Sequence, residues 1–178
     1  MEYALLGWPP DGPTFRLDYR RFSYAGKFVM SGTGKAVARA DEIVAAVAFN
    51  EDRTDADTLW LRYVTVREDH RGEGIGPQLC HFAAERARER GYGRVKIAVN
   101  NPFAFEALSK AGFAFTGEET GIAELVMVRP GERTRESYQT GLDVYRERDL
   151  SDAEAEFLRE RDGQDPPATI RTVRADDD

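Results

Sequence analysis

The chain has 178 residues, 41% hydrophobic and 32% charged, a composition typical of one globular domain rather than of a disordered chain. Its 25 Lys and Arg against 32 Asp and Glu give a net charge of -7, which argues against nucleic acid as a partner. One cysteine excludes an intramolecular disulfide framework. The lack of a secretory leader pattern and of an apolar run of about 18 residues predicts a soluble, cytoplasmic protein without a membrane partner.

The first strands are expected after residue 34. Two small apolar stretches between Lys35 and Phe49, separated by the polar residues 40–42, are typical of a hairpin. Residues 59–66 follow a polar run and are rich in β-branched and aromatic side chains, which favours a third strand.

The middle of the chain predicts alternating helices and strands. Residues 77–90 place apolar side chains at helical spacing, with proline at the first position and Gly91 just past the end. A strand, a helix and two further strands are then expected, at 94–99, 102–111, 113–116 and 122–128. Hairpins around a βαβ crossover predict an α/β or α+β domain with a mixed sheet.

The composition changes beyond Pro130. Residues 1–130 hold 17 basic and 18 acidic side chains, whereas residues 131–178 hold 8 and 14, so almost all of the net negative charge lies in the last segment. Ser151 and Glu154 form a capping box that predicts a short helix to about Arg161, and residues 166–178 are expected to be a frayed tail. We therefore predict a domain of residues 1–130 and an acidic C-terminal extension of residues 131–178.

The segment 71–77, Arg-Gly-Glu-Gly-Ile-Gly-Pro, lies between a predicted strand and a predicted helix. Glycines let the backbone approach a ligand, and the free N–H groups at a helix start suit a pyrophosphate. The alternative is a purely structural tight turn. A nucleotide-binding protein is disfavoured, because Pro77 breaks the dinucleotide glycine pattern and Ala36 follows Gly34-Lys35 where the Walker pattern needs Ser or Thr.

A different pattern fits this segment. Arg71, Gly74 and Gly76 complete R/Q-x-x-G-x-G/A, and Asn101-x-x-Ala104 follows thirty residues after Arg71, before Lys-Ala-Gly-Phe at 110–113. Together these motifs resemble the GNAT superfamily of acetyl-CoA-dependent N-acetyltransferases, over residues 35–128. The resemblance implies a mixed, V-splayed β-sheet flanked by helices, with the C-terminal helical or irregular extension outside the match.

The resemblance also implies the site. The strand 59–66 would carry a bulge, and the backbone of Val64, Thr65 and Val66 would bind pantetheine, with the Val64 N–H stabilising charge on the acetyl carbonyl. Asn101 would steady pantetheine or the adjacent loop; its other role is a cap for the helix at Pro102. The pyrophosphate would be held by Arg71, Gly72, Glu73, Gly74, Ile75 and Gly76. The implied co-substrate is acetyl-CoA, with no metal.

Both familiar proton-transfer groups are missing. Leu108 stands where many members have an acidic tyrosine, and Trp60 stands where some protein-acetylating members have a basic glutamate. Ser109 is a poor acid and points elsewhere on the helix. An acid or base supplied from another position, or water, remains an alternative; the candidate residues are Tyr63, Glu68, His70 and Glu124.

Other reactive or aromatic side chains are expected to be structural. Cys80 is expected to be a buried core residue, and His81, on a charged helix, is expected to lie on the surface. The aromatic residues of the N-terminal third are expected mainly in the core, with the lining of an amine pocket as the alternative: Trp8, Phe15, Tyr19, Phe22, Tyr24 and Phe28.

We therefore expect an N-acetyltransferase that moves acetyl from acetyl-CoA to a primary amine, on a small molecule, peptide or protein, by direct attack in a ternary complex. The alternative is a non-catalytic acyl-CoA-binding regulatory or interaction module, because Leu108 and Trp60 replace the familiar acid and base. A homodimer is left open.

Overall fold

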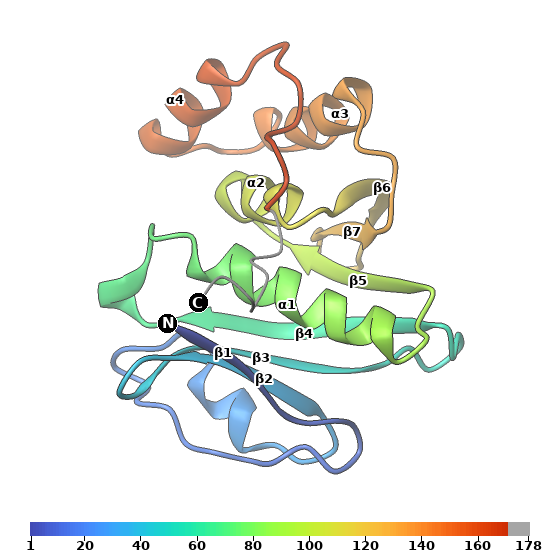
Figure 1. Ribbon diagram of the computed structural model, residues 1–178. Helices are drawn as coiled ribbons and strands as arrows, with labels where there is room; N and C mark the ends of the chain where they lie inside the picture. Colours follow the sequence, from blue (N-terminus) through green and yellow to red (C-terminus); the bar gives the residue numbers. More distant parts are fainter. Residues whose placement is uncertain (171–178) are drawn as a thin grey trace, which may run out of the picture.

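The computed structural model describes residues 1–170, and the last eight residues, which include the end of the predicted tail, lie outside the described part. Seven strands form one sheet in the order β1-β2-β3-β4-β5-β7-β6 (Figure 1). The strands are β1 Glu2–Gly7, β2 Gly34–Arg39, β3 Ile43–Glu51, β4 Thr58–Val66, β5 Arg94–Val99, β6 Ala114–Glu119 and β7 Leu125–Arg129. Neighbours are antiparallel except β4 and β5, which are parallel, so the predicted mixed sheet is confirmed.

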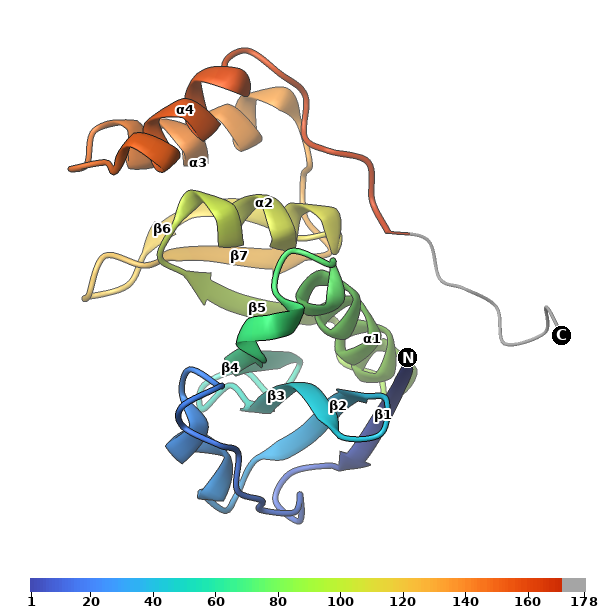
Figure 2. The same cartoon turned by 90° about the vertical axis from the view of Figure 1, so that its left-hand side faces the viewer.

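The helices cover this sheet in two groups. They are α1 Ile75–Glu89, α2 Pro102–Lys110, α3 Arg135–Arg146 and α4 Asp152–Glu160, with short 3-10 turns at Ala25–Val29 and Glu68–His70. Helix α1 lies across the β1–β4 half, while α2, α3 and α4 stack beyond the β5–β7 half (Figures 1 and 2). Among residues 1–170, no helix is both long enough and apolar enough to span a membrane.

Strand β4 separates two apolar clusters because its side chains alternate between the faces of the sheet. Leu59 and Leu61 pack with Leu79 of α1 in the main core. On the opposite face, Tyr63 packs against a smaller cluster that includes Phe28 from the N-terminal segment. Figure 2 shows this segment on the side of the sheet away from α1. Apolar side chains therefore cover both faces of the sheet at β4.

A bulge divides β4. Tyr63 lies opposite Ala48 and Leu61 opposite Phe49, so Arg62 is an extra residue without a partner on β3. On its other side, β4 pairs with β5 only from Thr58 to Leu61. Beyond Leu61 the two strands separate, and the end of β5 pairs with β7 alone. The bulge and the splay expected from the family resemblance are both present.

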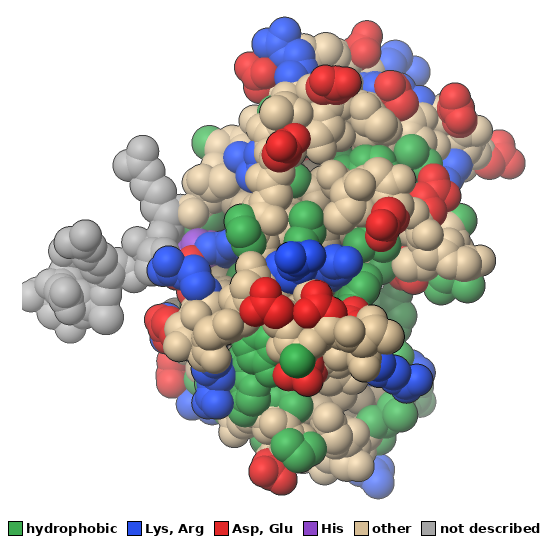
Figure 3. Space-filling view, turned by 90° about the vertical axis from the view of Figure 1, so that its right-hand side faces the viewer, with side chains coloured by type: hydrophobic (Ala, Val, Ile, Leu, Met, Phe, Trp, Pro, Cys, Tyr) green, Lys and Arg blue, Asp and Glu red, His purple; other side chains and the backbone are tan. Residues whose placement is uncertain are grey.

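The C-terminal segment contains more ordered structure than was predicted. Besides the capped helix at Ser151, it forms α3, which was not expected. Tyr138, Leu142 and Tyr145 of α3 are buried in the main core beside Phe105 of α2. Figure 3 shows many acidic side chains in the upper part of the molecule, at the height of α3 and α4 in Figure 1, with basic side chains among them and further acidic ones lower on the same face. The division at residue 130 stays a prediction.

Candidate functional site

The open edge of β4 carries backbone groups that face the splay. The Arg67 N–H donates to the Val44 carbonyl of β3 at 2.8 Å. Because backbone direction alternates along a strand, the groups of Thr65 also face β3, and those of Val64 and Val66 face the opening. The Val66 carbonyl accepts a bond from Arg71 Nε at 3.3 Å on that side. Of the three predicted strand residues, Val64 and Val66 therefore lie at the opening and Thr65 does not.

The hydroxyl of Thr65 is buried. The residue is 4% exposed, and its Oγ1 atom has no hydrogen-bond partner among the described residues. Such a group carries a desolvation cost in the folded protein.

The glycine turn leads from the open edge into α1. Gly72 and Gly74 have φ of 84° and 80°, in the left-handed region that favours glycine, and a Cβ at either would meet nothing within 4 Å. Gly74 caps α1 without a side-chain hydrogen bond, so no capping side chain occupies the amides at the start of this 15-residue helix. Gly76 has a different role: a Cβ there would lie 3.3 Å from Val66 Cγ2, so glycine lets α1 approach β4 closely.

The turn carries charges of both signs. Arg71 is exposed, and besides Val66 it contacts Ser23 Oγ through Nη2 at 3.3 Å. Glu73 lies in the same turn, and its Oε2 is 2.9 Å from His70 Nδ1. The combination of free helix amides, the positive end of the helix dipole and Arg71 can bind an anion such as a pyrophosphate.

Asn101 caps α2. Its Oδ1 accepts a bond from the Ala104 N–H at 2.8 Å, and Pro102 occupies the first helical turn. The cap role is therefore present, and the predicted role beside pantetheine stays a prediction.

The positions of the missing acid and base are now visible. Leu108 is buried in the main core, and Ser109 is buried with its Oγ 3.4 Å from Arg133 Nη2. Trp60 lies on β4, and its indole N–H donates to Asp52 Oδ2 at 2.5 Å. This bond is the first of several that lower the pKa of Asp52 to about 2.

The four alternative proton-transfer candidates are not gathered in one place. Glu68 is exposed in the 3-10 turn before Arg71, and His70 is engaged by Glu73. Glu124 is hydrogen bonded through its backbone to Thr120 on the β6–β7 connection. Tyr63 differs from them, because it lines a cavity beside the splay.

This cavity, of about 630 Å³, lies on the sheet face opposite α1. It is lined by Lys27, Met30, Ser31, Gly32, Thr33, Asn50, Asp52, Arg53, Trp60, Arg62 and Tyr63. Trp60 and Leu61 belong to the last pairs that join β4 to β5, so the cavity borders the point where the two strands separate. No N-terminal aromatic residue belongs to its lining. Phe22 and Phe28 are buried in the core as expected, whereas Tyr19 and Tyr24 are exposed, so the expectation of core packing is wrong for these two.

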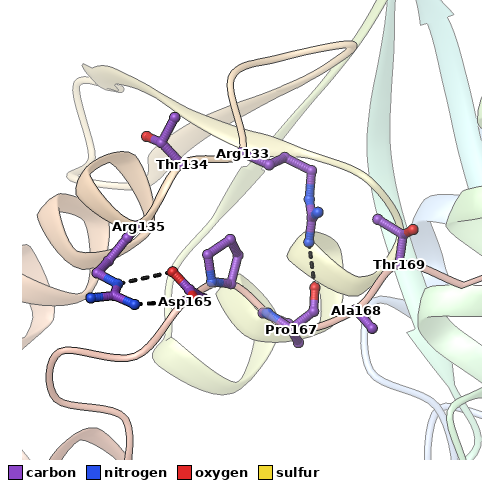
Figure 4. Close-up of a pocket in the computed structure, with 8 residues that line it drawn as sticks. Arg133, Thr134, Arg135, Asp165, Pro167, Ala168 and Thr169 are labelled. Carbon is purple, nitrogen blue, oxygen red and sulfur yellow. Dashed lines mark hydrogen bonds and ion pairs between the residues drawn. The ribbon is translucent and has the colours of Figure 1, made fainter.

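A second cavity, of about 580 Å³, lies between the start of α3 and the C-terminal segment (Figure 4). Its two arginines are already bonded: Arg133 Nη2 donates to the Pro167 carbonyl at 2.6 Å, and Arg135 pairs with Asp165 at 2.9 Å. It contains none of the predicted site residues.

The expectation that His81 lies on the surface is wrong. His81 is 9% exposed, and its Nδ1 is 2.9 Å from Arg129 Nη1. Arg129 also forms an ion pair with Glu85. Burial and the neighbouring Arg129 both lower the pKa of His81. Arg129 comes from β7, 48 residues further along the chain, so no local pattern signals this contact.

Cys80 is fully buried, as predicted, and burial raises the pKa of its thiol to about 12. In the part of the chain that the structure describes, no group of three or more His, Cys, Asp or Glu side chains could hold a metal ion.

Comparison with known proteins supports the reading of these motifs. The model of the acetyltransferase (GNAT) family matches residues 3–113. Streptothricin acetyltransferase from Streptomyces lavendulae is 39% identical over 66 residues, which are 36% of this chain and 35% of that protein. The similarity thus spans about a third of that relative.

Among solved structures, nourseothricin acetyltransferase matches with a TM-score of 0.48 and 28% identity, over 54% of this chain and 64% of that one. An acetyltransferase from Bacillus subtilis, solved in complex with CoA, matches with a TM-score of 0.47 and 21% identity, over 54% and 75% of the two chains.

Proposed function

Because the chain belongs to the GNAT acetyltransferase family and is therefore an acyltransferase, we propose that it transfers acetyl from acetyl-CoA to a primary amine by direct attack in a ternary complex. The observation that carries this proposal is the splay of the sheet. Strand β4 loses its parallel partner after Leu61, and the backbone of Val64 and Val66 faces the opening beside the glycine turn.

The residues at the splay suit acetyl-CoA. Val64 and Val66 offer strand-type hydrogen bonds to the amides of a pantetheine arm, and the start of α1 with Arg71 offers an anion site for the pyrophosphate. Acetyl-CoA supplies an activated acyl group with a thiolate as the leaving group.

The Val64 N–H is the proposed electrophilic group. It would point at the acetyl oxygen and stabilise the negative charge that develops there as the amine attacks. Removing one such donor costs enzymes about 10²- to 10³-fold in kcat. This backbone group needs no particular side chain, which fits a site whose familiar acid and base positions are occupied by Leu108 and Trp60.

Proton transfer is assigned to water, with Tyr63 as the side-chain candidate, because Tyr63 follows the bulge and lines the adjacent cavity. General acid–base groups contribute about 10²- to 10⁴-fold, and a thiolate leaves without full protonation, so turnover without a dedicated acid is feasible.

The test is thiol release from acetyl-CoA in the presence of a panel of amines. The panel should contain amino acids, diamines, lysine peptides and streptothricin, the last because of the relative's name. We expect release that depends on the amine and an N-acetylated product by mass spectrometry. Tight CoA binding without release from any amine would favour the acyl-CoA-binding module, which the loss of both proton-transfer side chains motivates.

A further inference from the structure

The cavity beside the splay carries an excess of positive charge. Lys27, Arg53 and Arg62 line it, against one carboxylate, Asp52. Within residues 1–170, none of these three cations forms an ion pair. The cavity therefore has a net charge of +2.

Asp52 is not available to a ligand as a free carboxylate. Its Oδ1 accepts bonds from the Thr54 N–H and hydroxyl at 2.8 and 2.9 Å and from the Asp55 N–H at 3.1 Å. Its Oδ2 accepts the Trp60 indole N–H. Four donors from its own loop and from β4 hold this group, so its role is to fix the loop and the indole ring.

Contacts with Asn50 and Trp60 hold the side chain of Arg62 in place. It is the extra residue of the bulge, and its Nε donates to Asn50 Oδ1 at 2.7 Å. Its guanidinium carbon lies 5.0 Å from the centre of the Trp60 ring, and Lys96 Nζ of β5 lies 5.8 Å from the same ring. Stacking on an aromatic ring orients the planar fork of an arginine.

The guanidinium of Arg62 is open to a ligand. Arg62 is an exposed residue, and among the described residues the structure gives no protein hydrogen bond to its two Nη atoms. A carboxylate accepts two parallel bonds from such a fork.

The cavity adjoins the strand residue to which the acetyl group is assigned. Tyr63 contributes to its wall and directly precedes Val64, whose N–H faces the splay. Trp60 pairs with Lys96 one position before the last joined pair of β4 and β5. The cavity therefore lies on the acceptor's side of the proposed transfer, next to the point where β4 and β5 separate.

We propose that the acceptor is a small amine that also carries a carboxylate, bound by Arg62 with Arg53 and Lys27 at the rim. This inference rests on the proposed acetyl transfer and adds the substrate class. In the reaction the amine nitrogen bonds to the acetyl carbon while the C–S bond breaks, and its electron pair stays on sulfur. The proton lost by nitrogen passes to water, and the thiolate takes a proton from water.

The positive charge of the cavity also favours the reactive form of the amine. Like charges nearby disfavour the ammonium form of the bound amine, and the neutral form is the one that attacks. The attraction between the acceptor's carboxylate and Arg62 offsets the repulsion between its amine and the cations of the cavity. A diamine without a carboxylate has two cationic groups and no anchor, so it is excluded.

The experiment compares matched acceptors by thiol release at pH 8. The set contains 5-aminopentanoate, pentylamine and 1,5-diaminopentane, with 2-aminoethylphosphonate to separate carboxylate from phosphonate recognition. We expect kcat/KM for 5-aminopentanoate to exceed that for pentylamine by at least about tenfold, with the diamine lowest. A higher kcat/KM for the phosphonate than for 5-aminopentanoate would overturn the assignment.

Substitutions test whether Arg62 causes the preference for an acceptor with a carboxylate. Arg62→Gln is expected to lower kcat/KM for 5-aminopentanoate by about tenfold or more. The loss for pentylamine, which has no carboxylate for the arginine to bind, should be smaller, and the CoA affinity should change less than about twofold. Arg62→Lys should recover part of the loss. Arg53→Gln, at an exposed rim position, is the second variant in case Arg62→Gln fails to fold. Arg88→Gln, whose side chain is 77% exposed on α1, is the matched control.

The outcomes separate the two proposals. Turnover of pentylamine and 5-aminopentanoate with equal kcat/KM would overturn the carboxylate inference and leave acetyl transfer standing. A loss of CoA binding in Arg62→Gln equal to its loss of kcat/KM would also overturn it, because the arginine would then belong to the CoA site. Absence of turnover with every amine would overturn the acetyl transfer itself.

Discussion

The hydroxyl of Tyr145 in α3 donates to the carbonyl oxygen of Val99, 3.1 Å away, at the end of β5. Tyr145 is 1% exposed, and burial raises the pKa of its hydroxyl. The bond joins a helix outside the family match to the strand that forms one arm of the splay. The C-terminal segment therefore contributes to the core that supports the site.

The first prediction tests this contribution through Gly141 of α3. A Cβ at this position would lie less than 3.0 Å from the buried Phe105 ring of α2. Gly141→Ala should therefore lower the free energy of unfolding by about 2 kcal/mol, as overpacking does. Urea denaturation measures the loss. Gly121→Ala, where an added Cβ meets nothing within 4 Å, is the control and should stay within about 0.5 kcal/mol of the wild type.

The second prediction concerns the anion site at the start of α1. Gly74→Asp should weaken CoA binding by well over tenfold, because it places a carboxylate where the pyrophosphate is expected. Gly74→Asn is the matched control, since Asn tolerates the φ of 80° about as well as Asp and carries no charge. Calorimetric titration with CoA gives both affinities. Equal affinities for the two variants would show that the turn does not bind the phosphates.

A third prediction addresses the direction of the β4 backbone groups. Val64→Pro removes an N–H that faces the splay, so we expect a folded protein whose kcat falls by at least about 100-fold. Thr65→Pro removes an N–H that faces β3 and should destabilise the protein by about 3 kcal/mol or more. Thermal unfolding and thiol release are measured together. Unchanged kcat in folded Val64→Pro would contradict the role given to this amide.

The fourth prediction follows from the buried His81. Its pKa is lowered in the folded state by burial and by Arg129, so the unfolded chain binds more protons at mildly acid pH. The stability that His81 contributes is therefore present above its ordinary pKa of about 6.5 and is lost as the pH falls below that value.

His81→Gln should reduce this acid-side loss, because the charge on Arg129 then meets a neutral side chain at every pH. Urea unfolding at pH 7.5, 6.5 and 5.5 measures the slope. His70→Gln removes the other histidine, at the turn beside Glu73, and is the control. The same slope in wild type and His81→Gln would rule out this residue as the cause.

Local sequence patterns predicted those helices and strands whose buried side chains recur at regular helical or strand spacing. The hairpin of β2 and β3, the strand β4, the helix α1 and the strand β5 are found where apolar spacing and glycine signals placed them. Strand β1 was not predicted, because it is held by pairing with β2 across a connection of more than twenty residues. Helix α3 was also missed, although Thr134 caps it and Tyr138, Leu142 and Tyr145 follow at helical spacing. The surrounding arginines and acidic residues masked that signal.

The candidate site also has a part that could be predicted from the sequence and a part that could not. Its backbone part could be predicted from the glycine motif and the family resemblance, because both depend on a continuous stretch of chain. The cavity could not, because Lys27, Asp52 and Arg62 come from three segments that meet only in the folded sheet. His81 was misjudged for the same reason, since Arg129, which contacts its ring, belongs to β7.

The extra residue at position 62 has a consequence for how this site is encoded. In a regular strand, side chains three positions apart lie on opposite faces. Trp60 and Tyr63 are three positions apart, yet both line the same cavity, because the bulge resets the alternation between them. Deleting residue 62 would remove one lining side chain and also turn the lining residues on one side of the bulge to the other face of the sheet. The spacing of the residues, as much as their identity, determines which side chains line this cavity.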